Sequence, residues 1–454
     1  MVSNNECDGT WDYRRRNIVV IQVDDLAWHH LGCQNPNSFY ETPNLDNLAQ
    51  RGWRFSQAYS AAPICSASRA GLMTGVSPAK LGLEFVTKPS RASFPTHTKL
   101  IQPSYPQELP FSTPTLADYL SEAGYSTGFV GKWHLTQNGS SYLAYGDENG
   151  PEQRGFTWSQ GQFGAHPYAY SDRDLKEYEP GIFPVDDSSK SAVQFIRDNS
   201  SRPFYLHFSS YFPHVPLHTP CKWLFEKYQS KNSSLTKEQI FYAAMVESMD
   251  HYIGHIFQEL EYQNLSSETM IIFTSDHGGD PRHDTNCPHR GSKWTLYEGG
   301  IRVPFMISWP EVLKPEIICN DPIGGIDLMS TLCDLVNLVP PKGQDGTSLL
   351  PLLGGTDEID RSTPLFWHFP FYHPSTGYQG TTPCSAIRVQ NWKLIHFFED
   401  QRSELYNLEV DVMEREDLSR RESKVSIDLE GQLLSILHRG GARLPRHNPE
   451  YLSF

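Results

Sequence analysis

The sequence predicts an α/β fold in which helices sandwich a large, mixed but mostly parallel β-sheet, followed by a smaller C-terminal α+β subdomain. Short β-branched runs alternate with helical patterns between residues 17 and 308, which is typical of a parallel sheet. The pattern changes beyond about residue 360, where short strands and one closing helix follow. With 454 residues, 38% of them hydrophobic, the chain is long and apolar enough to bury a substantial core.

The first expected strand is NIVVIQV, residues 17–23, a continuously apolar and β-branched run that indicates a strand buried on both faces. Four later runs have the same character: Ser126–Val130, Phe204–Ser209, Met270–Thr274 and Phe305–Ser308. Ligands of such sheets bind outside the carboxyl ends of the strands. The residues that directly follow these runs are therefore the candidates for ligand binding and catalysis.

Helical patterns lie between the expected strands. Apolar residues recur at helical spacing in Pro43–Gly52, Thr115–Ala123 and Lys237–Leu260. Beyond residue 360, Pro364–Phe371, Ser385–Val389 and Trp392–Phe398 indicate the strands of a short antiparallel sheet, and Val425–Leu437 indicates an amphipathic helix. We expect a catalytic domain over residues 1–360 and a C-terminal subdomain over residues 361–454.

The charge balance restricts the class of partner. The chain has 38 Lys+Arg against 53 Asp+Glu, a formal net charge of −15, which argues against nucleic acid. The sequence contains no apolar run of membrane-spanning length. Its first residues lack a signal-peptide core, so either the chain is cytosolic or a leader was removed; we expect a periplasmic or secreted protein. None of the eight cysteines forms a Cys-x-x-Cys pair, which excludes zinc-ribbon and thioredoxin-type sites.

Acidic residues follow two expected strands. Asp24 and Asp25 end the first run, and Asp276 and His277 end the run at 270–274. Adjacent carboxylates are costly unless a positive charge lies between them, and an oxygen-rich set suits calcium or magnesium. The alternative is that each pair caps the following turn or helix.

The segment around Cys65 is the most informative stretch. It opens an expected helix after a turn, which places Cys65 at a positive helix terminus with Arg69 one turn away. Cys65 is therefore a candidate nucleophile with a lowered pKa. The alternative is a small buried apolar residue near a helix start.

The motif Cys65-x-Ala67-x-Arg69, followed by Thr74-Gly75, resembles the signature of the type I, formylglycine-dependent sulfatases of the alkaline-phosphatase-like superfamily. Further blocks resemble that family in the same order: VDDLAWHHLGC (23–33), YETPNLDNLAQRGWRFSQAYSAAPIC (40–65), GYSTGFVGKWHL (124–135), FPHVPLHTP (212–220), SDHGGD (275–280) and GSKWTLYEGGIRVPFMISWP (291–310). Two positions depart from the common pattern, namely Ala67, where proline is commoner, and His277, where many members carry asparagine.

The resemblance implies a cofactor and a set of roles. Cys65 would be converted by a formylglycine-generating maturation enzyme into an aldehyde whose hydrate is the nucleophile. Asp24, Asp25, Asp276 and His277 would hold the divalent cation, most simply calcium, together with the group at position 65. The other catalytic residues implied are Arg69, Lys132, His134, His214 and Lys293.

These residues divide the chemical work. Arg69 and Lys132 would orient the hydrate for in-line attack on sulfur, and His214 beside Lys293 would protonate the leaving alcohol. His134 would accept the proton from the second hydroxyl as sulfate is expelled. Lys132 and His134 alternate, so on an extended segment both would point to one face.

The sequence is compatible with three functions. The favoured one is a carbohydrate sulfatase, for which a small aryl sulfate would serve as a surrogate. The alternatives are an arylsulfatase or phosphodiester or phosphonate-ester hydrolase on the same fold, and a sulfated-glycan-binding protein whose cysteine is never converted.

The expected substrate is the terminal unit of a sulfated glycan, with galactose as the guessed sugar. A chain of net charge −15 is poorly suited to bind a long polyanion, whereas a closed pocket with local cations would bind one sulfated unit. The aromatic stretch Trp367–His373 could supply that pocket, or it could be core. The candidate substrate-binding residues are His218, which could instead lie behind the contact residues, His368 and His373.

Overall fold

The computed structural model describes residues 16–87, 98–137, 145, 148–161, 174–283, 288–310, 312–355, 359, 361–373 and 381–451. Its centre is an eight-stranded sheet. In spatial order the strands are β10 (Ile317–Cys319), β2 (Trp53–Phe55), β9 (Phe305–Ser308), β8 (Thr269–Ser275), β1 (Asn17–Val23), β7 (Phe204–Ser209), β5 (Ser126–Gly131) and β6 (Trp158–Gln160). All five strand runs expected from the sequence are present.

The sheet is mostly parallel, as predicted. β8, β1, β7, β5 and β6 pair in parallel, whereas β9 runs antiparallel to both β8 and β2. β1 lies at the centre, between β7 and β8, and all seven of its residues are buried. This double burial explains why the run NIVVIQV is continuously apolar.

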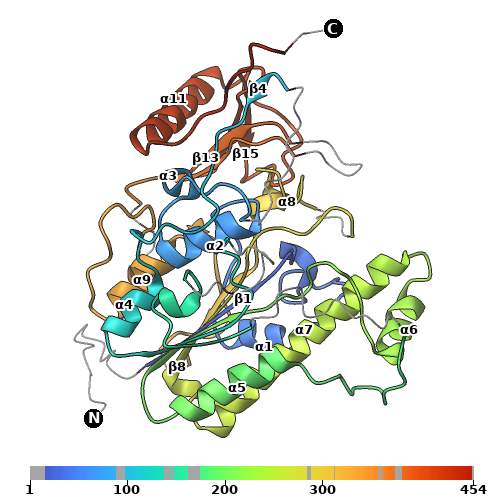
Figure 1. Cartoon of the computed structure of the whole chain (residues 1–454). Coiled ribbons are helices and arrows are strands. Elements are labelled where there is room, and N and C mark those ends of the chain that lie inside the picture. The colour runs from blue at the N-terminus through green and yellow to red at the C-terminus, as the bar shows by residue number, and fades with distance from the viewer. Residues whose placement is uncertain are drawn as a thin grey trace, which may run out of the picture.

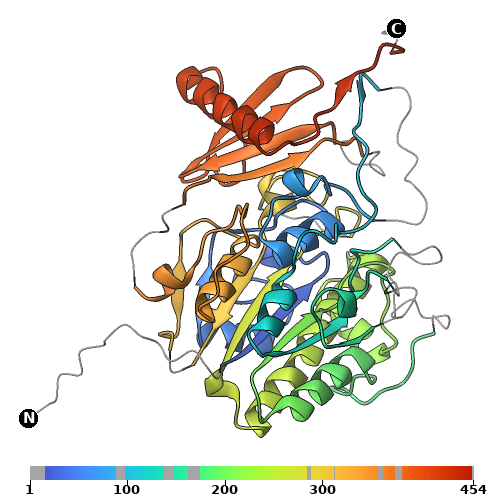
Figure 2. The same cartoon turned by 60° about the vertical axis from the view of Figure 1, so that its left-hand side comes forward.

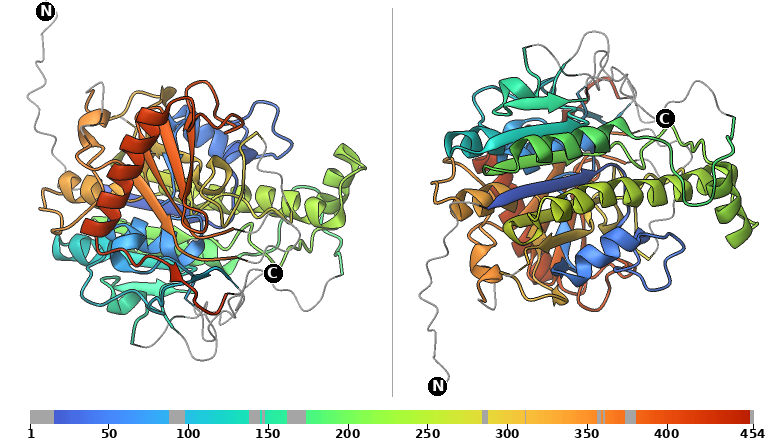
Figure 3. Two further views of the ribbon diagram at one scale, coloured as in Figure 1. Left: turned by 90° about the horizontal axis from the view of Figure 1, so that it is seen from above. Right: turned by 90° about the horizontal axis from the view of Figure 1, so that it is seen from below.

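Helices cover both faces of the large sheet (Figures 1 and 3). Side chains of Ile18 and Val20 pack on the face covered by α2 (Cys65–Thr74), α4 (Leu116–Glu122) and α9 (Asp327–Leu335). Val19 and Ile21 pack on the other face, with α1 (Pro43–Gln50), α5 (Asp187–Asn199) and α7 (Lys237–Tyr262). The expected helices over 43–52, 115–123 and 237–260 are therefore α1, α4 and α7. Thr115 and Thr236 begin the last two with capping boxes.

The C-terminal region is a four-stranded antiparallel sheet with a helix on one face (Figure 2). Its strands are β12 (Leu365–Phe369), β13 (Cys384–Val389), β14 (Trp392–Phe397) and β15 (Arg402–Asn407), and the helix is α11 (Ser423–Arg439). β15, with the sequence RSELYN, was missed because its polar residues give no apolar run. The division at residue 360 stays a prediction, since Trp367 and Phe369 belong to the same core as the large sheet.

The remaining elements are short. The helices are α3 (Pro78–Leu81), α6 (Lys222–Lys231), α8 (Glu298–Ile301) and α10 (Leu350–Leu353). β3 (Ala58–Tyr59) pairs with β11 (Ile323–Gly324), and β4 (Leu100–Ile101) pairs with β16 (Arg446–His447). Among the described residues, none of the helices is long and apolar enough to cross a membrane.

Candidate active site

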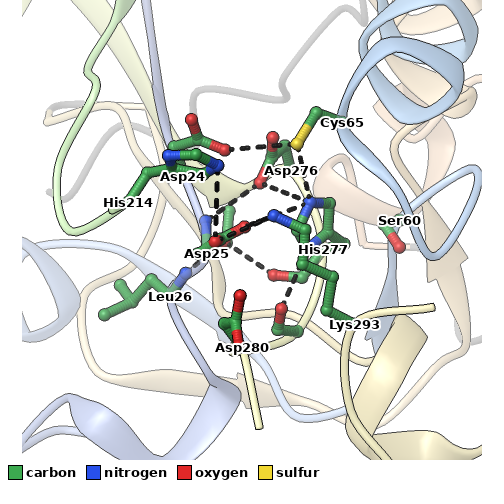
Figure 4. A network of polar contacts seen from close by, with 12 residues as sticks. Asp24, Asp25, Leu26, Ser60, Cys65, His214, Asp276, His277, Asp280 and Lys293 are labelled. Carbon is green, nitrogen blue, oxygen red and sulfur yellow. Dashed lines mark hydrogen bonds and ion pairs between the residues drawn. The ribbon is translucent and has the colours of Figure 1, made fainter. Parts of the chain in front are cut away.

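Two acidic strand ends meet at one edge of the large sheet. β1 and β8 are parallel neighbours with Val23 opposite Ser275, so the residues after them, Asp24 and Asp276, lie side by side. The backbone N–H of Asp25 donates to Asp276 Oδ1 at 3.2 Å. Asp25 has a φ of +66°, a left-handed conformation that is unfavourable for a residue other than glycine. The two acidic pairs noticed in the sequence therefore form one cluster (Figure 4).

Cys65 is the first residue of α2 and points into this cluster (Figure 4). Its Sγ lies 3.1 Å from His277 Nε2 and 3.6 Å from Asp24 Oδ1. Cys65 is only 2% exposed, and the ten-residue helix α2 ends at Thr74, followed by Gly75, whose φ of +68° suits glycine. Cys65 thus lies at a helix start, as predicted, and its Sγ is close to a carboxylate.

Three buried cations surround the carboxylates. Lys132 Nζ pairs with Asp24 Oδ2, and Arg69 Nη2 lies 2.9 Å from Asp276 Oδ2. Lys293 Nζ donates to both carboxylate oxygens of Asp25, at 2.7 and 2.9 Å. These charges are almost wholly removed from water. In the protein interior, both their mutual attraction and the cost of desolvation are large.

The pKa values of the cluster show how it distributes charge. Burial disfavours the charged carboxylate of Asp24, but Lys132, His214 and Arg69 together hold its pKa well below the usual range. Burial and the neighbouring Asp24 raise the pKa of Asp276. Burial opposes the protonation of His277, yet Asp276, Cys65 and Asp25 raise its pKa to about 9. The position between these groups therefore favours a positive charge.

The donor set fits a divalent cation. Ligand atoms of Asp24, Cys65, Asp276 and His277 all lie within 4.8 Å of one another, as do those of Asp24, Asp25, Cys65 and His214. Each set combines two carboxylates with one imidazole and the thiol of Cys65. The carboxylate oxygens suit calcium or magnesium, whereas nitrogen and sulfur ligands are less typical of calcium. Asp24, Asp25, Asp276 and His277 are thus able to hold the ion next to the side chain at position 65.

Two histidines lie around the cluster. His214 Nε2 is 3.8 Å from Asp25 Oδ2, while its Nδ1 is 2.6 Å from the carbonyl oxygen of Val215. His134 is buried, and burial, Lys132 and Arg69 hold its pKa well below the ordinary value. The alternation argument for Lys132 and His134 is wrong, because His134 has a φ of +57° and is not extended. Both side chains nevertheless lie near Asp24, since their segment follows β5 at the same sheet edge.

The three expected substrate-binding histidines lie in different surroundings. The ring of His218 is buried and packs on Phe241 of α7, with 5.1 Å between ring centroids. His373 stacks on Trp294, the residue after Lys293, at 3.8 Å between centroids and 9° between planes. Contact of these two residues with a substrate stays a prediction, and His373 has the more suitable position.

His368 is part of the C-terminal core. It is 3% exposed, its Nδ1 lies 2.6 Å from Ser385 Oγ, and its Nε2 lies 3.2 Å from the carbonyl oxygen of Arg443. This position does not support the expected contact with substrate. The neighbouring aromatic residues Trp367, Phe369 and Phe371 are buried as well, so this part of the aromatic stretch is core and not a sugar-binding wall.

Three further residues around the site were not singled out from the sequence. The hydroxyl of Tyr242 in α7 donates to the carbonyl oxygen of Asp25 at 3.2 Å, and Ser209 Oγ accepts from Arg69 at 2.5 Å. Asp280 lies beside Lys293 (Figure 4) and forms a bidentate pair with Arg282. Of these three, only Asp280 could have been found from the sequence, because it is the last residue of the family-like block SDHGGD.

The fold, the buried Cys65 and the adjoining cluster that could hold a divalent cation together indicate a hydrolase of anionic esters. A family model described as Sulfatase matches residues 16–338, and one described as N-sulphoglucosamine sulphohydrolase, C-terminal, matches residues 291–438. The chain belongs to the sulfatase family and is a sulfuric ester hydrolase of alkaline-phosphatase-like fold. Sulfatases generally use a metal ion and a formylglycine.

Individual relatives agree with this family. A sulfatase of Formosa agariphila is 30% identical, with 92% of this chain and 87% of that protein covered. Human N-acetylgalactosamine-6-sulfatase is also 30% identical, with 78% of this chain and 68% of that protein covered. The crystal structure of Ps i-CgsB in complex with k-i-k-neocarrahexaose superposes with a TM-score of 0.73 at 25% identity, covering 93% of each chain.

Proposed function

We propose that this protein removes sulfate from the terminal unit of a sulfated glycan, using a formylglycine formed from Cys65 and a divalent cation, most simply calcium. The observation that carries the proposal is the position of Cys65. Cys65 is the first residue of α2, and its Sγ lies within 4.8 Å of the ligand atoms of Asp24, Asp276 and His277. The Cβ of Cys65 would become the aldehyde carbon, and the thiol sulfur marks the position that an oxygen of the hydrate would take.

The bound cation would supply a Lewis acid that polarises a sulfate oxygen. The chain's own cations provide the rest of the charge compensation. Lys132, Arg69 and Lys293 are each held against a different aspartate, so their positions are set before an anion arrives. Preorganised charges of this kind stabilise a developing negative charge without reorganisation during the reaction.

Two histidines suit the two proton transfers of sulfate-ester cleavage. We assign His214 as the group that gives its proton to the leaving sugar oxygen when the S–O bond breaks, because its Nε2 lies beside Asp25 and Lys293. We assign His134 as the acceptor of the proton that leaves position 65 when sulfate departs. Burial beside Lys132 and Arg69 lowers the pKa of His134 and keeps its imidazole neutral, as a proton acceptor requires.

The substrate class rests on different support. One relative of the chain is named N-acetylgalactosamine-6-sulfatase, and the similar structure of Ps i-CgsB is a complex with k-i-k-neocarrahexaose. The net charge of −15 disfavours a long polyanion bound in an open groove. Trp294 and His373 form a stacked aromatic pair next to Lys293, which would place a sugar ring beside the sulfate.

The first test is the mass of the peptide that contains Cys65, followed by assays with matched substrates. We expect conversion of cysteine to formylglycine, and release of sulfate from sulfated galactose-type sugars in proportion to the converted fraction. An unconverted cysteine in an active preparation would contradict the proposal. Faster hydrolysis of a phosphodiester or phosphonate ester than of any sulfate ester would favour the alternative enzyme class.

The second test decides the position of attack. Defined sulfated oligosaccharides should lose sulfate from the non-reducing end before any internal unit. Early release from internal units, with the terminal unit untouched, would overturn terminal specificity while leaving sulfatase activity intact.

A further inference from the structure

A second cluster of buried charges lies between the main domain and the C-terminal sheet. Glu298, Lys393 and Glu414 are each 0% exposed. Lys393 Nζ lies 2.9 Å from Glu298 Oε1 and 2.9 Å from Glu414 Oε1, and the backbone N–H of Glu298 donates to Glu414 Oε2 at 2.7 Å. The three residues are called the Glu298–Lys393–Glu414 triad below.

The triad joins distant parts of the chain. Glu298 begins α8, Lys393 lies in β14, and Glu414 follows β15. The second carboxylate oxygen of Glu298 accepts from Tyr59 Oη at 2.8 Å and from Arg302 Nη1 at 3.2 Å. Figure 1 shows α8 between the C-terminal sheet and the main domain. The triad therefore connects the C-terminal sheet to the turn of α8.

Helix α8 also supports the loop that carries the proposed metal ligands Asp276 and His277. The N–H of Gly278 donates to the carbonyl oxygen of Gly300 at 3.0 Å, and a Cβ on Gly278 would lie 1.8 Å from the carbonyl oxygen of Gly299. The N–H of Lys293 donates to the carbonyl oxygen of Gly279 at 3.1 Å. Because these backbones touch, a shift of α8 would move both His277 and Lys293.

We propose that Lys393 is a positioning residue for catalysis: by holding Glu298 and Glu414 it sets the place of α8, and through α8 that of the loop bearing Asp276, His277 and Lys293. Burying three charges between the main domain and the C-terminal sheet carries a large desolvation cost, and well-packed apolar residues often stabilise an interface as much or more. Directional contacts, in contrast, define one register between α8 and β14. This proposal rests on the proposed function for the cation site, but what it claims is the position of the loop that bears Asp276, His277 and Lys293.

The first experiment compares Lys393→Met with the wild type. Methionine keeps an unbranched apolar stem and removes the charge. We expect faster hydrogen exchange at the amides of Gly278 and Lys293 in metal-free protein, about tenfold weaker binding of added calcium or magnesium by calorimetry, and a similar loss in kcat. The exchange readout needs neither metal nor substrate, so a failure of this inference is separable from a failure of the proposed function.

Lys393→Met leaves two buried carboxylates next to each other, which could prevent folding. The double variant Lys393→Met/Glu414→Gln removes one charge of each sign and avoids this. It should recover most of the lost melting temperature while exchange at Gly278 stays fast and metal binding stays weak. Wild-type exchange and metal affinity in the folded double variant would overturn the inference.

Arg361→Met is the matched control. Arg361 pairs with the buried Asp327 at 2.7 Å, at the start of α9, which places a similar ion pair outside the metal-ligand loop. We expect it to lower the melting temperature but to leave exchange at Gly278 and metal affinity unchanged. Equal changes in both variants would show general loosening of the protein and would count against a positioning role.

Discussion

Two clusters of buried charge in the described part of the chain are arranged differently. In the Glu298–Lys393–Glu414 triad, opposite charges alternate, and each carboxylate of the pair contacts the ammonium at 2.9 Å. At the active site, the lysines and Arg69 lie around the outside, while ligand atoms of Asp24, Asp276, His277 and Cys65 face one another within 4.8 Å.

This difference separates a structural cluster from a functional one. Both clusters are equally buried, so burial of charge does not identify the site. The distinguishing feature is the convergence of metal-binding atoms, because Lys132, Arg69 and Lys293 offset the repulsion between the carboxylates from outside and an added cation would relieve it further. The backbone supports the same conclusion, because Asp25 is held at a φ of +66° by its bonds to Asp276, Lys293 and Tyr242.

The largest expected effect comes from the nucleophile position. Cys65→Ala should abolish turnover, because it removes the precursor of the formylglycine, while it costs about 1 kcal/mol or less in stability. Steady-state assays and thermal unfolding measure the two effects. Activity above background in a preparation proven free of wild-type enzyme would contradict this assignment.

Removal of the cation should affect activity and stability together. Exhaustive chelation should stop turnover and lower the melting temperature, since the carboxylates of the active-site cluster then repel one another; a ligand at a hundred times its Kd contributes about 2.7 kcal/mol. Asp276→Asn should have a low melting temperature that chelator no longer changes. Full activity in verified metal-free protein would exclude a cation requirement.

A smaller effect is expected from His277→Asn. An amide oxygen can still coordinate a hard cation, so this variant should bind calcium more weakly, by roughly tenfold, without losing the site. Titration calorimetry with calcium and magnesium measures the change for each ion. A complete loss of binding would show that the imidazole is essential and that an oxygen ligand does not replace it.

The last prediction concerns stability alone and another buried carboxyl group, Glu84. Both of its carboxylate oxygens lack a hydrogen-bond partner, Arg443 Nη2 is 3.6 Å away, and burial raises its pKa to about 7. The folded state therefore binds this proton more tightly than the unfolded state. Stability should fall as pH rises from about 4.5 to 7, by up to about 3 kcal/mol, and stay low above that.

Glu84→Gln should remove this part of the pH dependence, as measured by denaturant unfolding between pH 5 and 8. Glu259→Gln provides a control of opposite sign. Hydrogen bonding to Arg197 lowers the pKa of Glu259, so its contribution is present at neutral pH and is lost as pH falls through the acidic range. Parallel pH curves for wild type and Glu84→Gln would contradict the role given to Glu84.

Local patterns predicted much of the fold. β1, β7 and α7 follow from runs and periodicities that lie within one segment, and Asp24, Cys65 and Asp276 stand in recognisable motifs. β15 was missed because a half-polar strand takes its stability from pairing with β14, a partner its own residues do not reveal. His368 was misjudged because an imidazole beside aromatic residues has the same sequence context in a pocket and in a core.

By itself, the sequence determined the fold class, the family resemblance and the candidate residues for a cation site, because strand-end carboxylates and the helix start at Cys65 are local features. Tertiary structure alone decided which charges became partners. Lys132 meets Asp24 across 108 positions and Lys393 meets Glu298 across 95, through strands and loops that are brought together only by folding. The physical reason is that an ion pair depends on distance in space, and spacing along the chain carries no information about that distance.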